Sequence, residues 1–270
     1  MQYFILTSLA FIFGLVVGSF LNCVIYRIAK KESFLVKRSY CPHCEHPLSW
    51  HDLFPVVSFL LLKGRCRYCQ ESISAQYPLV ELATGTVFSS VLYKNLPLLL
   101  SVPFDFWILS LIFLFFVSSV LIIIFVYDLK HYIIPDKVIF PAILIATGWR
   151  LVTAIFYEPY QEFTILNGFL SALGAAAFFF SIVWLSKGKG MGMGDVKFVI
   201  LMGMFLGFPE ILMALLLSFL LGSVVGVFLI MTGKKGLKSE VPFAPFLVTG
   251  TFLVMFWGEK LFQLLGMIGR

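Results

Sequence analysis

The run FWILSLIFLFFVSSVLIIIFVY, residues 106–127, carries no charged side chain and is followed directly by Asp128. As an α-helix, at about 1.5 Å per residue, this run extends about 33 Å and can cross the hydrocarbon core of a bilayer. The rest of the chain is similar, since 60% of its 270 residues are hydrophobic, 13% are charged and its mean hydropathy is +0.98. This composition excludes an ordinary soluble domain and a disordered chain, and it predicts a membrane protein.

Further apolar runs lie on both sides of this one, and together they predict an all-α polytopic membrane protein with about eight transmembrane helices. These runs cover about residues 3–27, 76–93, 138–157, 165–186, 196–208, 210–231 and 241–258. The run 196–208 is only about 20 Å long as a helix and ends at Pro209. If this run is counted as a crossing, two spans separate the lysine-rich gap at 187–197 from the one at 232–240. Both gaps then lie on the same face of the membrane.

The basic side chains predict the direction of the runs. Sixteen of the 20 Lys and Arg residues fall in four gaps, at residues 27–74, 128–137, 187–197 and 232–240. Positive charge between spans is retained in the cytoplasm, so we expect these gaps inside, and the gaps near 94–105 and 158–164 and both termini outside. Because the basic residues are separated by apolar runs, they form no continuous surface, and we expect no nucleic-acid partner.

The longest of the four gaps predicts a small cytoplasmic domain. We therefore expect three parts: a first transmembrane helix at 1–27, a loop domain at 28–74 and a seven-helix membrane region at 75–270.

Four cysteines of the loop domain form two CxxC pairs, Cys41-Pro-His-Cys44 and Cys66-Arg-Tyr-Cys69. Two such turns can supply four thiolates to a tetrahedral zinc ion, which then has no open position for water and is structural. Disulfides are the alternative, and a reducing cytoplasm disfavours them. A second alternative replaces one cysteine ligand by a nearby histidine: His43, His46 or His51. Cys23 lies in an apolar run and is expected to pack as a small hydrophobic residue.

Three aspartates border apolar runs on the predicted cytoplasmic side: Asp128, Asp136 and Asp195. Asp136 follows a proline and precedes the run 138–157, as a helix N-cap does. Asp195 follows glycines at 190, 192 and 194, which permit positive φ and close backbone approach. Neighbouring carboxyls do not both ionise readily, so Asp128 and Asp195 can serve as a general acid and base that activate water against a peptide carbonyl. The alternatives are a capping role for Asp195 and a solvated helix end for Asp128.

These motifs, in this order, resemble the type IV prepilin peptidases, which are bacterial polytopic aspartyl proteases with a Gly-x-Gly-Asp motif. The resemblance begins at Gly18-Ser-Phe-Leu-Asn-Cys-Val-Ile-Tyr-Arg27, runs through both CxxC pairs and Tyr77-Pro-Leu-Val-Glu81, and ends with Asp128 to Asp136 and Gly192-Met-Gly-Asp195. It implies an eight-helix membrane fold, catalytic roles for Asp128 and Asp195, and zinc at Cys41, Cys44, Cys66 and Cys69. It also implies a multi-pass protein of the bacterial cytoplasmic (inner) membrane that cleaves a short basic leader from prepilins or pseudopilins at the cytoplasmic face.

The resemblance further implies N-methylation of the new N-terminal residue with S-adenosylmethionine. No motif for that cofactor is present, so its binding residues stay unassigned; Glu81 is a candidate polar group, and a favourable interaction with a helix dipole is its other interpretation. Two other classes of protein are weighed against a peptidase. A transporter would need paired broken helices in related halves, and the chain has one glycine-rich break and no repeat. A zinc-bearing scaffold would use the aspartates only as helix caps.

Overall fold

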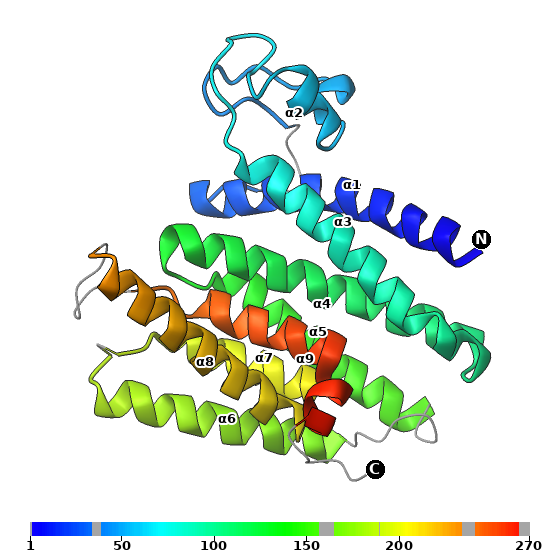
Figure 1. The fold of residues 1–270 in the computed structure, drawn as a ribbon, viewed down its shortest axis with the longest axis vertical. Coiled ribbons are helices and arrows are strands. Elements are labelled where there is room, and N and C mark those ends of the chain that lie inside the picture. Colours follow the sequence, from blue (N-terminus) through cyan, green and yellow to red (C-terminus); the bar gives the residue numbers. More distant parts are fainter. Residues whose placement is uncertain (1, 34–38, 157–164, 189, 234–240, 265–270) are drawn as a thin grey trace. The chain divides into compact units, whose positions relative to one another are not determined.

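A computed structural model of the chain describes residues 2–33, 39–156, 165–188, 190–233 and 241–264 (Figure 1). These residues are mainly helical. Their β-type pairing consists of two isolated bridges, Tyr40 with Pro47 and Arg65 with Ser72. The structure therefore confirms the prediction of an all-α protein.

Long helices coincide with all the predicted apolar runs. They are α1 (Gln2–Lys30), α3 (Gln76–Asn95), α4 (Phe104–His131), α5 (Asp136–Phe156), α6 (Ile165–Leu185), α7 (Met193–Leu206), α8 (Glu210–Met231) and α9 (Ala244–Leu264). Short elements stand between them: η1 (Trp50–Leu53), α2 (Val57–Leu61) and η2 (Pro97–Leu100).

Five of the described helices, α1, α4, α5, α6 and α8, are long and apolar enough to cross a membrane. The chain is therefore a multi-pass helical membrane protein, while a count of eight crossings remains a prediction that depends on α3, α7 and α9. The predicted outer gap 158–164 and most of the predicted inner gap 232–240 lie outside the described residues.

The chain divides into two compact units, Met1–Ile123 and Ile124–Arg270, with the boundary inside α4. In the first unit, α1 and α3 run antiparallel, since the amide of Asn22 donates to the Tyr77 carbonyl near the start of α3. A Cβ added at Gly18 would lie 2.7 Å from the Cα of Glu81. Small residues at such crossings let two helix backbones touch, and the helices gain van der Waals contact that larger side chains would prevent.

In the second unit, α7 contacts α5, α6, α8 and α9. Glycine again permits close approach, because a Cβ at Gly203 of α7 would overlap the backbone of Ala172 in α6. With 14 residues, α7 extends only about 20 Å, less than the thickness of a hydrocarbon core of about 30 Å.

Polar side chains from two neighbouring helices satisfy the backbone where this short helix ends. The guanidinium of Arg150 in α5, only 4% exposed, donates from Nε to the Met204 carbonyl (2.7 Å) and from Nη2 to the Phe205 carbonyl (3.1 Å). The Asn167 amide in α6 accepts from the Phe208 N–H (2.6 Å) and donates to its carbonyl (2.9 Å). The last carbonyls of a helix have no partner within the helix, and lipid supplies none, so these contacts permit α7 to end inside the protein.

We expect Arg150→Met to destabilise the second unit, because it leaves the Met204 and Phe205 carbonyls without these donors. Each buried unpaired carbonyl costs about 1–3 kcal/mol, so the thermal unfolding midpoint in detergent should fall by about 3–10 °C. The midpoint of Arg150→Lys should fall less than that of Arg150→Met. Arg65→Met, the same change at an exposed arginine, should have the midpoint of the wild type. Equal midpoints for Arg150→Met and Arg65→Met would contradict the capping role.

Candidate active site and metal centre

The two CxxC turns of the first unit have the same backbone geometry. The N–H of Glu45 donates to the Cys41 carbonyl (3.0 Å), and the N–H of Gln70 donates to the Cys66 carbonyl (3.1 Å). Glu45 and Gln70, each the residue after the second cysteine of its pair, both adopt positive φ, at 56° and 60°. Each turn therefore presents its two sulfurs in the same way, as the spacing predicted.

The four sulfurs form a cluster of metal-ligand size. The Sγ atoms of Cys41, Cys44, Cys66 and Cys69 all lie within 4.8 Å of one another, and all four cysteines are free thiols. Cys41 Sγ lies 3.9 Å from Cys69 Sγ, close to the edge of about 3.8 Å for a tetrahedron with Zn–S bonds of about 2.3 Å. Among the described residues, this cluster contains no histidine, so the all-cysteine ligand set is favoured over the histidine alternative.

Local hydrogen bonds prepare one of these thiols for metal binding. Burial of Cys41, which is 3% exposed, favours the neutral thiol, but backbone N–H groups of Cys44 and His43 donate to its sulfur and lower the pKa of the Cys41 thiol to about 7. The thiolate is the form that binds a metal.

Asp52 joins the second CxxC turn to the η1 segment. Its carboxylate accepts hydrogen bonds from Ser49 Oγ (2.8 Å), Arg67 Nε (2.7 Å) and Tyr68 Oη (3.2 Å), and Arg67 and Tyr68 are the two residues inside the second CxxC pair. Burial opposes ionisation of Asp52, but these donors outweigh it and hold the pKa of the carboxyl below its usual range. Sequence analysis missed this residue, because nothing in a polar loop distinguishes one aspartate from another.

Asp128 lies in the last turn of α4 and is 5% exposed, so the alternative of a solvated helix end does not hold. The backbone N–H of Ala244, the first residue of α9, donates to its carboxyl. Since residues from Ile124 onward belong to the second unit, Asp128 and Asp195 are part of the same compact body.

Asp195 is the third residue of α7, and its Oδ2 accepts a hydrogen bond from the Gly192 N–H (3.2 Å). One carboxylate oxygen therefore does cap the helix, as the alternative interpretation held. The same carboxyl also interacts electrostatically with Asp128, which a cap alone does not require. The fold thus brings together two acids that are 67 positions apart in the sequence.

Of the glycines before Asp195, Gly194 serves close approach to a neighbouring segment, and none has positive φ. Gly192 has an extended backbone with φ −84°, and the glycines with positive φ among the described residues are Gly64, Gly188, Gly207 and Gly233. At Gly194, an added Cβ would lie 3.2 Å from the Cβ of Ile134, a buried residue between α4 and α5. A side chain at position 194 would require Ile134 to shift, so glycine lets the start of α7 pack against the turn that follows Asp128 without displacing it.

Asp136 does not occupy the N-cap position that the sequence predicted for it. It is the first residue of α5, and the first helical N–H groups, of Val138 and Ile139, donate to the Pro135 carbonyl. Its Oδ1 instead accepts from Lys197 Nζ at 2.6 Å. Lys197 follows Asp195 by two residues, so this ion pair links the start of α5 to the first turns of α7. The sequence offered no signal for the pair, because its members are 61 residues apart.

Glu81 lies in the second turn of α3 and is buried, and its Oε2 accepts the backbone N–H of Val56 at 2.7 Å. It therefore holds the loop domain to the helix pair α1 and α3, a role that neither sequence interpretation included.

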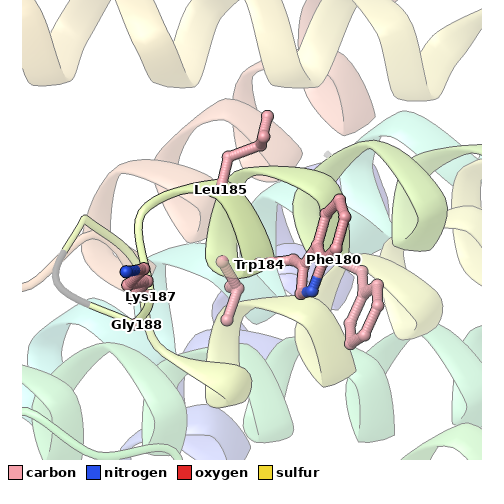
Figure 2. Close-up of a pocket in the computed structure, with 6 residues that line it drawn as sticks. Phe180, Trp184, Leu185, Lys187 and Gly188 are labelled. Atoms are coloured by element: carbon pink, nitrogen blue, oxygen red, sulfur yellow. The ribbon is translucent and has the colours of Figure 1, made fainter.

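A surface hollow at the end of α6 contains neither aspartate (Figure 2). Its lining comes from one helix end and the turn after it: Phe180, Val183, Trp184, Leu185, Lys187 and Gly188. Tryptophan and lysine at the end of an apolar helix are typical of the membrane–water interface, and none of the lining residues belongs to the proposed catalytic or metal-binding set.

The fold and these clusters define a class: a polytopic helical membrane protein with a four-cysteine cluster that could hold a metal ion in one unit and two acids, Asp128 and Asp195, in the other. Comparison with known proteins identifies the family. Residues 12–95, which include the four cysteines, match the bacterial peptidase A24 N-terminal domain, and residues 114–227, which include both aspartates, match the type IV leader peptidase family. The chain belongs to the type IV leader peptidase family and is a membrane protease.

Similar proteins cover nearly the whole chain. A prepilin leader peptidase/N-methyltransferase of Aeromonas hydrophila is 32% identical, with 94% of this chain and 91% of that protein aligned. One of Bacillus subtilis is 30% identical, with 94% and 95% aligned, and one of Myxococcus xanthus is 33% identical, with 85% and 65% aligned. No solved structure matches the chain.

If the cluster binds zinc, substitution of its two exposed cysteines, Cys44 and Cys69, should reduce the zinc content. Purified wild type should hold about one zinc ion per chain, and Cys44→Ser and Cys69→Ser should lose most of it, because a tetrahedral site with three thiolates binds more weakly. Cys23→Ser, outside the cluster, is the matched control and should keep its zinc. Elemental analysis after gel filtration measures the content; a wild type without zinc, or an equal loss in the control, would contradict the assignment.

Proposed function

We propose that this protein cleaves the leader peptides of type IV prepilins or pseudopilins with Asp128 and Asp195 as its catalytic pair, and then methylates the new N-terminal amine with S-adenosylmethionine. The observation that carries the assignment of the pair is that Asp128, at the end of α4, and Asp195, in the first turn of α7, belong to one compact unit, in which Gly194 packs closely against Ile134 in the turn after Asp128. The named relatives support the substrate class and the second activity.

The chemistry follows from two neighbouring carboxyls that share one proton. The ionised carboxyl takes a proton from water, and the water oxygen bonds to the carbonyl carbon of the scissile peptide. The protonated carboxyl donates a hydrogen bond to the developing oxyanion. As the C–N bond breaks, a carboxyl delivers a proton to the leaving amine, and the products are the leader with a new carboxylate and the pilin with a free amine.

Charge near the pair supports a site at the cytoplasmic face. Lys130, Lys137 and Lys197 lie at the same helix ends as the aspartates, and positive residues between spans stay inside. A basic leader would remain on that side while the apolar helix of the substrate lies in the membrane, so its scissile bond would reach the depth of the pair.

The four cysteines suit zinc, whose role would be to hold the two CxxC turns together. A closed four-thiolate shell has no position for water or substrate, so the ion stabilises the loop domain and takes no part in the peptide cleavage. S-adenosylmethionine would supply the methyl group; no residue is assigned to it.

Loss of either catalytic carboxyl should abolish cleavage. In detergent with a purified prepilin, Asp128→Asn and Asp195→Asn should each lower the rate by at least about 100-fold, because an amide cannot exchange the proton. Asp105→Asn, at the opposite end of α4 from Asp128, is the control and should cleave normally. Electrophoresis of the shortened pilin over time measures the rate, and cleavage by Asp195→Asn at the wild-type rate would overturn the pair.

The methylation step is tested apart from cleavage. With a pilin that already lacks its leader, both asparagine variants should still transfer a labelled methyl group, since the carboxyl pair is assigned to hydrolysis alone. Equal loss of both activities would mean that the variants are misfolded or that the pair serves both steps, and the thermal unfolding midpoint in detergent separates these two outcomes.

The ion pair between Asp136 and Lys197 should position Asp195 without touching the substrate. We expect Asp136→Asn and Lys197→Met each to lower kcat by about threefold to tenfold with little change in KM. The double variant should be no slower than the slower single variant, because both changes remove the same interaction. Lys197→Arg should recover most of the rate; additive losses in the double variant would show that the two residues act separately.

A further inference from the structure

The loop domain carries a contiguous set of large apolar side chains that the structure leaves exposed. They fall in one stretch of twelve residues that comprises η1 and α2: Trp50, Leu53, Phe54, Val57, Leu60 and Leu61. Leu60 and Leu61 are 67% and 78% exposed, and neither short helix has a buried residue. An apolar surface of this kind on a small polar domain is costly in water and marks a contact with an apolar partner.

A hydrogen bond shows at what height along α1 this stretch is held. The N–H of Val56, the residue before α2, donates to Glu81, and Glu81 lies against Gly18 of α1. Lys30, the exposed basic residue in the last turn of α1, marks the water side of the membrane, whereas Arg27 is buried. Gly18 comes twelve residues before Lys30. Val56 is therefore held below the level of Lys30, beside apolar turns of a membrane-spanning helix.

Charge beside the stretch agrees with a lipid surface. Lys63 and Arg65, both exposed, follow α2 directly. Residues 27–74 as a whole contain eight basic and four acidic side chains, an excess that attracts the anionic headgroups of the cytoplasmic leaflet. Tryptophan is enriched at the interface, where Trp50 supplies an apolar ring with a polar edge.

We propose that residues 50–61 lie in the cytoplasmic membrane interface, with the apolar side chains in contact with lipid and Lys63 and Arg65 at the headgroups. Lipid is the occupant because α1 already spans the bilayer, and the contact through Val56 and Glu81 holds α2 beside it at a height where lipid surrounds the helix. Segments with apolar residues on one side and basic flanks bind membranes in this way. The metal-bound turns would then rest on the membrane surface, anchored by α1, α3 and this segment.

Photo-crosslinking of the full-length protein in vesicles of phosphatidylethanolamine and phosphatidylglycerol tests the proposal. The crosslinker p-benzoylphenylalanine replaces Leu61 in one variant and, as a matched control, Glu71, an exposed residue of the second CxxC turn. After irradiation, mass spectrometry of the digested protein counts lipid adducts. The Leu61 variant should form at least about fivefold more lipid adducts than the Glu71 variant.

Zinc content identifies variants that retain a folded loop domain, and Leu60 is a second site if the Leu61 variant loses zinc. Lipid adducts at residue 60 or 61 in a zinc-bound protein would support the proposal. Crosslinks to peptides of the same chain or of a second copy, or an adduct yield no higher than at residue 71, would overturn it. The readout needs no substrate, so its failure is distinct from a failure of the proposed peptidase activity.

Discussion

The shortness of α7 is the constraint on which the second unit depends. A helix of 14 residues, about 20 Å long, is shorter than the hydrocarbon core is thick, so its last carbonyls need partners that lipid does not provide. Arg150 of α5 supplies these partners, and Asn167 of α6 bonds with the backbone of Phe208, just after the helix. The buried guanidinium of Arg150 is tolerated because its N–H groups donate hydrogen bonds to backbone carbonyls. The same bonds hold the far end of α7 in place.

The near end of α7 is fixed by different forces. Van der Waals contact between Gly194 and Ile134 joins the helix to the turn after Asp128, and the ion pair of Lys197 with Asp136 joins it to the start of α5. Neither contact involves the carboxyl of Asp128 or Asp195, the proposed catalytic pair, yet both lie beside these residues in the sequence. Contacts of this kind keep a reacting pair in place while its own polar atoms stay available for chemistry.

The sequence predicted which side chains have a special role better than it predicted which residues they contact. Cys41, Cys44, Cys66 and Cys69 could be grouped because a CxxC spacing fixes the local turn, and two turns complete a tetrahedron. Asp136 was interpreted as a cap from its local sequence, since a partner 61 residues away leaves no local trace. Arg150 did leave a signal, as a charge inside an apolar run, but only the packing of α5 against α7 shows that it serves backbone carbonyls.

By itself, the sequence determined the class of protein, the positions of the long helices and the four cysteines that the fold brings together. Each of these depends on residues close together in the chain: the length of an apolar run, the spacing of two cysteines, the charge of a gap. Only the tertiary structure decided which acid pairs with which partner, why Gly194 is a glycine, and where the apolar side chains of residues 50–61 are exposed. Helix packing sets these contacts, because it joins residues whose separation in the sequence carries no information about their distance in space.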